Sequence, residues 1–276
     1  MYVATIEGGV SMKVFISADI EGVTGVTHWD ETEKAKADHE YYAHQMTLEV
    51  KAACEGAISA GADEIWIKDA HDSGRNIDHN ILPKNTKLIR GWSGHYYSMM
   101  QGLDETFDAV ILIGYHSAGG TDYNPLAHTN NTSYEHVKLN GVYLSEFVIN
   151  SYMATCLNVP IVFLSGDLGI CEEAKRVAEK IVTVPVKEGV GNSTINIHPQ
   201  LALELIKKGV EEGLNKKLIG ANIKLPNEFK IDIKYHHHAD ALRKTAYPNV
   251  EQTGKKTIAY YTDDFMELVK SLRFLL

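Results

Sequence analysis

The chain has 276 residues, which is long enough for one large domain or for one domain with a smaller second portion. Hydrophobic residues make up 44% and charged residues 23%, as in a globular protein, and no stretch approaches the roughly 18 uninterrupted apolar residues of a membrane span. The formal net charge of -9 argues against nucleic acid as the main partner, because proteins that bind nucleic acid present a basic face.

The cysteines and the first residues bear on the cellular compartment. Cys54, Cys156 and Cys171 are odd in number and widely spaced, which argues against both a disulfide framework and a cysteine-based zinc site. We therefore expect a reducing, cytoplasmic environment. Residues 1–11 lack the charged start and apolar stretch of a secretory signal, and we interpret them as an N-terminal extension.

Up to about residue 190, the chain alternates predicted strands with predicted helices. Short apolar runs are typical of strands buried on both faces of a sheet, and apolar residues three and four positions apart are typical of helices. Such an alternation predicts a parallel sheet with helices on its faces. The predicted strands cover residues 14–16, 64–68, 87–90, 108–114 and 160–164. The predicted helices cover residues 38–60, 96–103, 146–157 and 171–181, and Asn140-Gly141 predicts a hairpin turn between strands 137–140 and 142–144.

The pattern changes beyond residue 190. It predicts a helix over residues 199–214, strands over 229–235 and 256–261, and a closing helix over 263–274. We therefore predict an α/β fold in which residues 12–190 form a parallel-rich central sheet with helices on both faces. A smaller α+β portion, residues 191–276, is expected to pack on it and to contribute to the substrate pocket and to oligomer contacts.

Ionisable side chains follow four of the predicted strands. In a parallel sheet the carboxyl ends of the strands lie along one edge, where ligands bind. Residues that are far apart in the sequence are therefore expected to converge there. The residues in question are Asp19 and Glu21, His71, His116, and Asp167.

Asp19 and Glu21 are the first of these residues to suggest a chemistry. Residues two apart on an extended segment face the same side, and two carboxylates so close repel each other unless a cation lies between them or one holds a proton. Alternatively, Asp19 caps a turn and Glu21 is solvated. Histidine and carboxylate are ligands that Zn²⁺ accepts without cysteine, so the presence of His71 and His116 favours a metal site.

Three further features allow two interpretations each. Glu146 begins a predicted helix, where it either favours the helix dipole or ligates a metal. His128 lies in the long loop 119–132, where it is either a solvated histidine or a proton shuttle or nucleophile. The run His236-His237-His238 points to alternate faces if it is extended, which favours strand-end or pocket-lining roles over metal binding.

Five short motifs occur in the order and approximate spacing of a known family. The chain resembles the zinc-dependent D-aminopeptidases that are associated with dipeptide-transport operons. The similarity covers most of residues 12–200, including the block 91–116, and becomes thin beyond about residue 200. The motifs are SADIEG (17–22), KDAH (68–71), IGYH (113–116), AHT (127–129) and NGVYLSE (140–146).

This resemblance implies a metallo-aminopeptidase that hydrolyses short peptides with an N-terminal D-amino acid, such as D-Ala-D-Ala, through a metal-activated water. It implies two Zn²⁺ ions per chain and a ring-shaped homo-oligomer, a decamer of two stacked pentamers whose active sites face an internal chamber. It implies His128 as the catalytic base or nucleophile. The implied ligands are Asp19 as the bridge, Glu21 on one zinc, and His71, His116 and Glu146 on the other.

Other interpretations stay open. The same ligands could serve a hydrolase of another amide, of an L-peptide or of a phosphoester. A phosphoester would favour a basic pocket, and near the motifs we find few basic residues apart from Lys68, Arg75 and Arg90. A non-catalytic binding or assembly protein would instead close the coordination sphere of a structural metal, whereas an enzyme keeps an open position.

Overall fold

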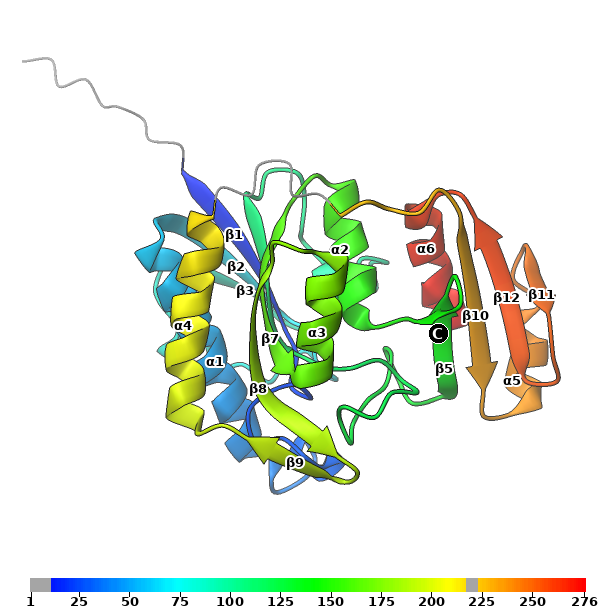
Figure 1. The fold of residues 1–276 in the computed structure, drawn as a ribbon, viewed down its shortest axis with the longest axis horizontal. Helices are drawn as coiled ribbons and strands as arrows, with labels where there is room; N and C mark the ends of the chain where they lie inside the picture. The colour runs from blue at the N-terminus through cyan, green and yellow to red at the C-terminus, as the bar shows by residue number, and fades with distance from the viewer. Residues whose placement is uncertain (1–10, 217–222) are drawn as a thin grey trace, which may run out of the picture.

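The computed structural model describes residues 11–216 and 223–276. The predicted N-terminal extension therefore lies outside the described residues, apart from Ser11. The chain forms two β-sheets, and Figure 1 shows helices α2 (Glu146–Cys156) and α6 (Phe265–Leu275) between them. Among the described residues, no helix is both long enough and apolar enough to cross a membrane.

The larger sheet has seven strands in the order β3-β2-β1-β4-β7-β8-β9. All neighbouring pairs are parallel except β8 and β9, which form an antiparallel hairpin. This confirms the predicted parallel-rich sheet. Its strands are β1 (Met12–Ala18), β2 (Ala62–Asp69), β3 (Thr86–Ile89), β4 (Ala109–Tyr115), β7 (Ile161–Asp167), β8 (Val182–Val190) and β9 (Ser193–Asn196).

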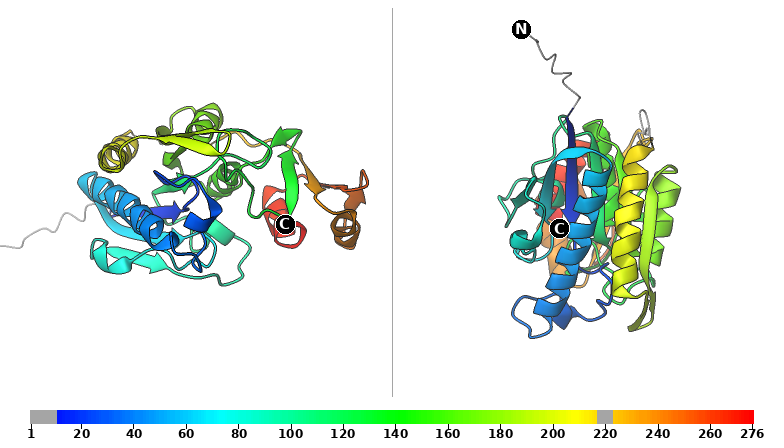
Figure 2. Two further views of the ribbon diagram at one scale, coloured as in Figure 1. Left: turned by 90° about the horizontal axis from the view of Figure 1, so that it is seen from below. Right: turned by 90° about the vertical axis from the view of Figure 1, so that its left-hand side faces the viewer.

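Helices cover both faces of this sheet, as predicted. Alternate residues of a strand point to opposite faces. On β1, Val14 and Ile16 pack with α1 (His39–Ser59) and α4 (Pro199–Asn215), whereas Phe15 belongs to the core on the side of α2. The right-hand view of Figure 2 shows α1 and α4 side by side. On the other face, α3 (Leu168–Val177) lies beside α2.

The segment 96–103 differs from its prediction as a short helix. It contains only a 3-10 turn, η3 (Ser98–Met100). Gly94 and Gly102 flank this turn with φ of 83° and 96°, values that break a right-handed helix. Two further 3-10 turns are η1 (Trp29–Glu31) and η2 (His79–Ile81).

The second sheet has five antiparallel strands in the order β11-β12-β10-β5-β6. The predicted hairpin at Asn140-Gly141 is confirmed, since both residues have positive φ, 49° and 85°, as a tight hairpin turn requires. Helix α5 (His238–Lys244) follows strand β10 and was not predicted. The strands are β5 (Tyr134–Leu139), β6 (Val142–Tyr143), β10 (Phe229–Tyr235), β11 (Val250–Gln252) and β12 (Thr257–Thr262).

Segments on both sides of residue 190 contribute to each sheet. The hairpin β5–β6 pairs with β10, with Leu139 opposite Ile231, so an early segment completes the second sheet. Conversely, α4 follows residue 190 and packs on α1 against the first sheet. The division into portions 12–190 and 191–276 stays a prediction.

Candidate metal centre

The six predicted site residues lie together at the carboxyl edge of the parallel sheet. Asp19 follows β1, His71 follows β2 and His116 follows β4. Glu146 is the first residue of α2, and His128 lies in the segment that connects β4 to β5. The topology therefore brings side chains that are up to 127 positions apart into one cluster.

A close approach of two backbone segments fixes the first two carboxylates. Asp19 N donates to the carbonyl oxygen of Ile113 at 2.8 Å, and Gly22 N donates to that of Gly114 at 2.8 Å. A Cβ atom at Gly22 would lie 1.9 Å from the carbonyl oxygen of Tyr115. Only glycine fits there, which explains why the SADIEG motif ends in this residue.

The three histidines share one arrangement of their ring nitrogens. His71 Nε2 donates to the carbonyl oxygen of Thr32 at 2.8 Å, His116 Nδ1 to that of Ser117 at 2.9 Å, and His128 Nδ1 to that of Leu126 at 2.9 Å. A carbonyl can only accept, so each donating nitrogen carries the proton. In the neutral ring, the other nitrogen then presents a lone pair, which is the usual orientation of a metal-ligating histidine.

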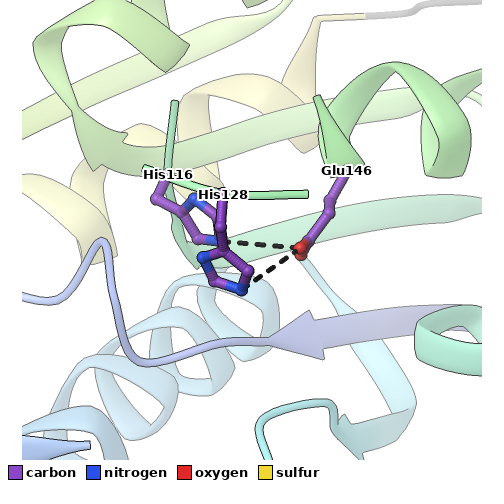
Figure 3. Close-up of side chains that lie close together, drawn as sticks. All are labelled: His116, His128 and Glu146. Carbon is purple, nitrogen blue, oxygen red and sulfur yellow. Dashed lines mark ion pairs between the residues drawn. The ribbon is translucent and has the colours of Figure 1, made fainter. Parts of the chain in front are cut away.

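The remaining nitrogens all face carboxylates. His71 Nδ1 lies 3.1 Å from Glu21 Oε2 and 3.3 Å from Asp19 Oδ1. His116 Nε2 lies 3.6 Å from both Asp19 Oδ2 and Glu146 Oε1. His128 Nε2 lies 3.8 Å from Glu146 Oε1 (Figure 3). Asp19 therefore turns one carboxylate oxygen toward each of two histidines.

His116 and His128 stack on each other, with ring centroids 4.4 Å apart and planes inclined by 13° (Figure 3). Glu146 Oε1 faces both rings and also accepts a hydrogen bond from Asn130 N at 2.6 Å. This backbone contact fixes the carboxylate of Glu146 against the loop that carries His128. The two residues whose roles were open in the sequence thus lie in the cluster.

Burial and like charge shift the pKa values of this cluster. Burial and the neighbouring charge of Glu21 raise the pKa of Asp19 well above its ordinary value. Burial lowers the pKa of His116, but the charge and close contact of Glu146, together with the charges of Glu21 and Asp19, outweigh it and raise that pKa to about 10. Burial and the charge of His116 lower the pKa of His128. Without a cation, the cluster must therefore bind extra protons, which balance the negative charge of its buried carboxylates.

These residues fit a metal in both their chemistry and their unsatisfied atoms. Glu21 Oε2 and His116 Nε2 are buried and make no hydrogen bond with any described residue. Two groups of side chains place their ligand atoms within 4.8 Å of one another. Imidazole nitrogen and carboxylate oxygen form a donor set that suits zinc. The groups are Asp19, Glu21 and His116, and His116, His128 and Glu146.

A buried hydrogen-bond network supports the loops that carry the cluster. Asp167 accepts from Ser117 N at 2.8 Å, from Ser117 Oγ at 2.5 Å and from Asn124 Nδ2 at 3.0 Å. The same Asn124 Nδ2 donates to the carbonyl oxygen of Glu21 at 3.0 Å, and Lys187 Nζ donates to it as well. Asp167 was expected at this edge but had no assigned role, and neither Asn124 nor Lys187 carried a signal in the sequence.

A cavity of about 840 Å³ opens over the cluster. Residues of α2 beyond Glu146 and residues of α6 also line it, and the aromatic side chains of Trp92, Tyr96 and Tyr97 form part of its wall. His236 lines a separate cavity of about 230 Å³ that also reaches His128. Within the part of the chain that the structure describes, none of His236, His237 and His238 belongs to a group that could hold a metal.

Comparisons with known proteins identify the family. The profile of the Peptidase M55 family, described as D-aminopeptidase, matches residues 12–274. A D-aminopeptidase of Bacillus subtilis (strain 168) is 25% identical over 263 residues, which is 95% of each chain. The solved structure of the Zn-dependent D-aminopeptidase DppA from Bacillus subtilis, described as a self-compartmentalizing protease, superposes with a TM-score of 0.87 at 23% identity over 96% of each chain. The chain therefore belongs to the M55 family of D-aminopeptidases and is a peptide hydrolase, as its motifs suggested.

Proposed function

We propose that the protein is a zinc-dependent aminopeptidase that removes an N-terminal D-amino acid from short peptides such as D-Ala-D-Ala. The observation that carries this proposal is the shared arrangement of the three histidines. Each donates one ring N–H to a backbone carbonyl and turns its other nitrogen toward the buried carboxylates of Asp19, Glu21 or Glu146. Zinc dependence is also the property for which the similar DppA structure is named.

The distances support two zinc ions that share Asp19. Asp19 Oδ1 faces His71, and Asp19 Oδ2 faces His116, as expected of a bridging carboxylate. Glu21 lies beside His71, and Glu146 lies beside His116. We therefore propose Asp19, Glu21 and His71 for one ion and Asp19, His116 and Glu146 for the other, whereas the sequence resemblance grouped His71 with His116 and Glu146.

The proposed chemistry divides between the metal and the side chains. Bound zinc would polarise the scissile carbonyl and make hydroxide available near neutral pH. The free α-amino group of the substrate needs an anionic partner, and the cavity wall also contains the carboxylates of Glu33 and Asp72, which are not among the proposed ligands. His128 Nδ1 is held by Leu126, so Nε2 is free to accept a proton and deliver it to the leaving amine.

The first experiment compares hydrolysis of D-Ala-D-Ala and L-Ala-L-Ala by zinc-reconstituted protein, with a chelator-stripped sample as the control. We expect zinc-dependent release of D-alanine from the D-peptide alone. If zinc remains bound but neither peptide is cleaved, the proposal is wrong. A hydrolase of another amide, or a binding role for the metal centre, would then replace it.

We also propose that the protein assembles into a closed homo-oligomer, a decamer of two stacked pentamers, in the cytoplasm. The similar DppA is described as self-compartmentalizing, and the three cysteines of this chain are free. The C-terminal portion supports the proposed pocket through α6, which supplies Val269 and Leu272 to the cavity. Multi-angle light scattering tests the assembly, since a mass of one or two chains would contradict it.

A further inference from the structure

We propose that Arg273, near the end of α6, binds the C-terminal carboxylate of the peptide substrate and so restricts the enzyme to short peptides with a free carboxyl group. This inference rests on the proposed aminopeptidase function and adds a subsite to it. Three observations support it. Charge is unevenly distributed in the large cavity, and the Arg273 guanidinium pairs with no described residue. An aminopeptidase also binds its substrate by the amino end, so the carboxyl end points away from the metal centre.

The cavity has two chemically different sides. The side formed by the sheet edge carries the carboxylates of the metal centre, with Glu33 and Asp72 also in its wall. The lining residues from α2 beyond Glu146 and from α6 are mostly apolar, and Arg273 supplies the only lysine or arginine side chain among the described residues that line the cavity. The apolar residues there are Ile149, Met153, Val269, Leu272 and Leu276.

Arg273 has no partner of its own in the described part of the chain. It makes no ion pair there with any carboxylate, and no hydrogen bond of its side chain is seen. An arginine in the last turn of a helix commonly balances the helix dipole. Here, however, Lys244 Nζ already donates to the carbonyl oxygen of Phe274, and Tyr235 OH donates to that of Leu275 at 2.7 Å. Other groups thus serve the end of α6 and leave the guanidinium available.

The substrate of an aminopeptidase enters with a fixed polarity. Its amino end and first carbonyl must lie at the metal centre, so the rest of the peptide extends away from the sheet edge. Helix α6, which carries Arg273, lines the same cavity as the metal cluster and lies between that sheet and β10 in Figure 1. A short peptide is a zwitterion, and its negative end then approaches the single guanidinium in the cavity wall. Arginine binds a carboxylate through two parallel hydrogen bonds, which add geometric specificity to the attraction between the charges.

Peptide length follows from this geometry. Each additional residue moves the carboxylate by at most about 3.6 Å, so only peptides of one or two lengths can reach both the metal centre and Arg273. We expect kcat/KM to peak at one length in the series from D-Ala-D-Ala to tetra-D-alanine. At that length, the free acid should exceed its C-terminal amide by about 10- to 100-fold, mainly through KM, because a charge-assisted hydrogen bond is lost in the amide.

The test compares the wild type with Arg273→Met, Arg273→Lys and a matched control, Arg243→Gln. Arg243 lies on neighbouring α5, is 72% exposed and pairs with Asp240, so its removal takes away the same charge outside the cavity. We expect R273M to abolish the preference for acid over amide, R273K to restore part of it, and R243Q to keep it. Thermal unfolding of each variant verifies the fold.

Two outcomes separate this inference from the proposed function. Arg273 is not a carboxylate subsite if the wild type cleaves the free acid and the amide equally well. The same conclusion follows if R273M lowers kcat/KM for the free acid and the amide by the same factor. In both cases the aminopeptidase function stands. If the wild type cleaves no D-peptide, the proposed function fails. In that case, calorimetry with zinc-loaded His128→Ala compares the binding affinity of D-Ala-D-Ala with that of its amide. The proposed subsite at Arg273 requires that the free acid bind more tightly than the amide.

Discussion

The two sheets differ in where their charged residues lie. In the seven-stranded sheet, Lys68, Asp167 and Lys187 are buried inside or at the carboxyl ends of its strands. In the five-stranded sheet, buried and partly exposed positions alternate along β10, and Lys230 and Lys234 form ion pairs on the outer side. Burying a charge is costly unless it is paired or hydrogen-bonded. The buried charged residues of the first sheet therefore lower its stability, and such a cost is typical of a functional site.

The segment that connects β4 to α2 joins these two regions. It leaves the first sheet after His116, carries His128, forms the hairpin of the second sheet and returns at Glu146. Four of the proposed ligands, Asp19, Glu21, His71 and His116, thus follow the ends of parallel strands. His128 and Glu146 depend instead on a segment that is anchored in both sheets. Because His128 is the one cluster residue that is not a proposed ligand, we predict that its loss impairs proton transfer without releasing zinc.

The largest effect is expected from Asp19→Asn, which removes the proposed bridge while keeping the shape of the side chain. Zinc content should fall, and kcat/KM should drop by at least about 1000-fold, because a bound metal supplies several kcal/mol of transition-state stabilisation. The metal-free variant should melt at a higher temperature than the metal-free wild type, since repulsion with Glu21 is relieved. Metal analysis, kinetics and calorimetry measure the three results.

Asp232→Asn is the matched control for this change. Asp232 lies on β10 and pairs with Lys230 at the surface of the second sheet, so its loss should affect neither zinc content nor turnover. Full zinc occupancy and normal turnover in Asp19→Asn would remove the bridging role of Asp19.

The next effect is expected from His128→Ala. Turnover should fall by about 100- to 10,000-fold, the usual contribution of a positioned acid or base, while zinc content stays unchanged. His136→Ala on β5 is the control, because it removes a histidine from the second sheet, outside the metal centre. Loss of zinc together with activity in His128→Ala would make His128 a ligand and would erase the distinction between the two regions.

The sequence predicted the convergence of the site residues because a general rule of parallel sheets determines it. Once strands end at Asp19, His71 and His116, the topology brings them to one edge whatever the loops do. Their roles as ligands stay a prediction. The partners of the β5–β6 hairpin and of α4 were not predictable, since pairing with β10 and packing on α1 depend on contacts between distant segments. The same holds for Asn124 and Lys187, whose local sequence resembles an ordinary loop and an ordinary strand.

A buried lysine of the first sheet makes stability depend on pH. Lys68 Nζ donates to the carbonyl oxygens of Asp69 at 2.6 Å and Gly91 at 2.7 Å, and burial lowers its pKa to about 8. The unfolded chain keeps the ordinary pKa of 10.5, so between these values it binds a proton that the folded protein has released. The free energy of unfolding must therefore rise with pH in that window, by up to about 1.4 kcal/mol for each unit of the shift.

Urea unfolding of the wild type and of Lys68→Met at pH 8 and pH 10 measures this contribution. The wild type should gain on the order of 1–3 kcal/mol relative to the variant as the pH rises. Lys234→Met, which removes a paired surface lysine of the second sheet, should keep the pH dependence of the wild type. Identical pH dependence in the wild type and Lys68→Met would show that Lys68 titrates as an exposed lysine does.

The smallest effect is expected from replacing one glycine in each region by alanine. Gly61 follows α1 with φ of 96° and Gly141 lies in the β5–β6 turn with φ of 85°, and a Cβ atom would contact nothing within 4 Å at either position. Alanine should therefore cost about 1 kcal/mol of stability at each site, through backbone strain alone. If β10 and the stacking of His128 on His116 hold the connecting segment, both variants keep zinc and turnover. Loss of turnover in Gly141→Ala alone, with zinc retained, would mean that the second sheet sets the position of His128.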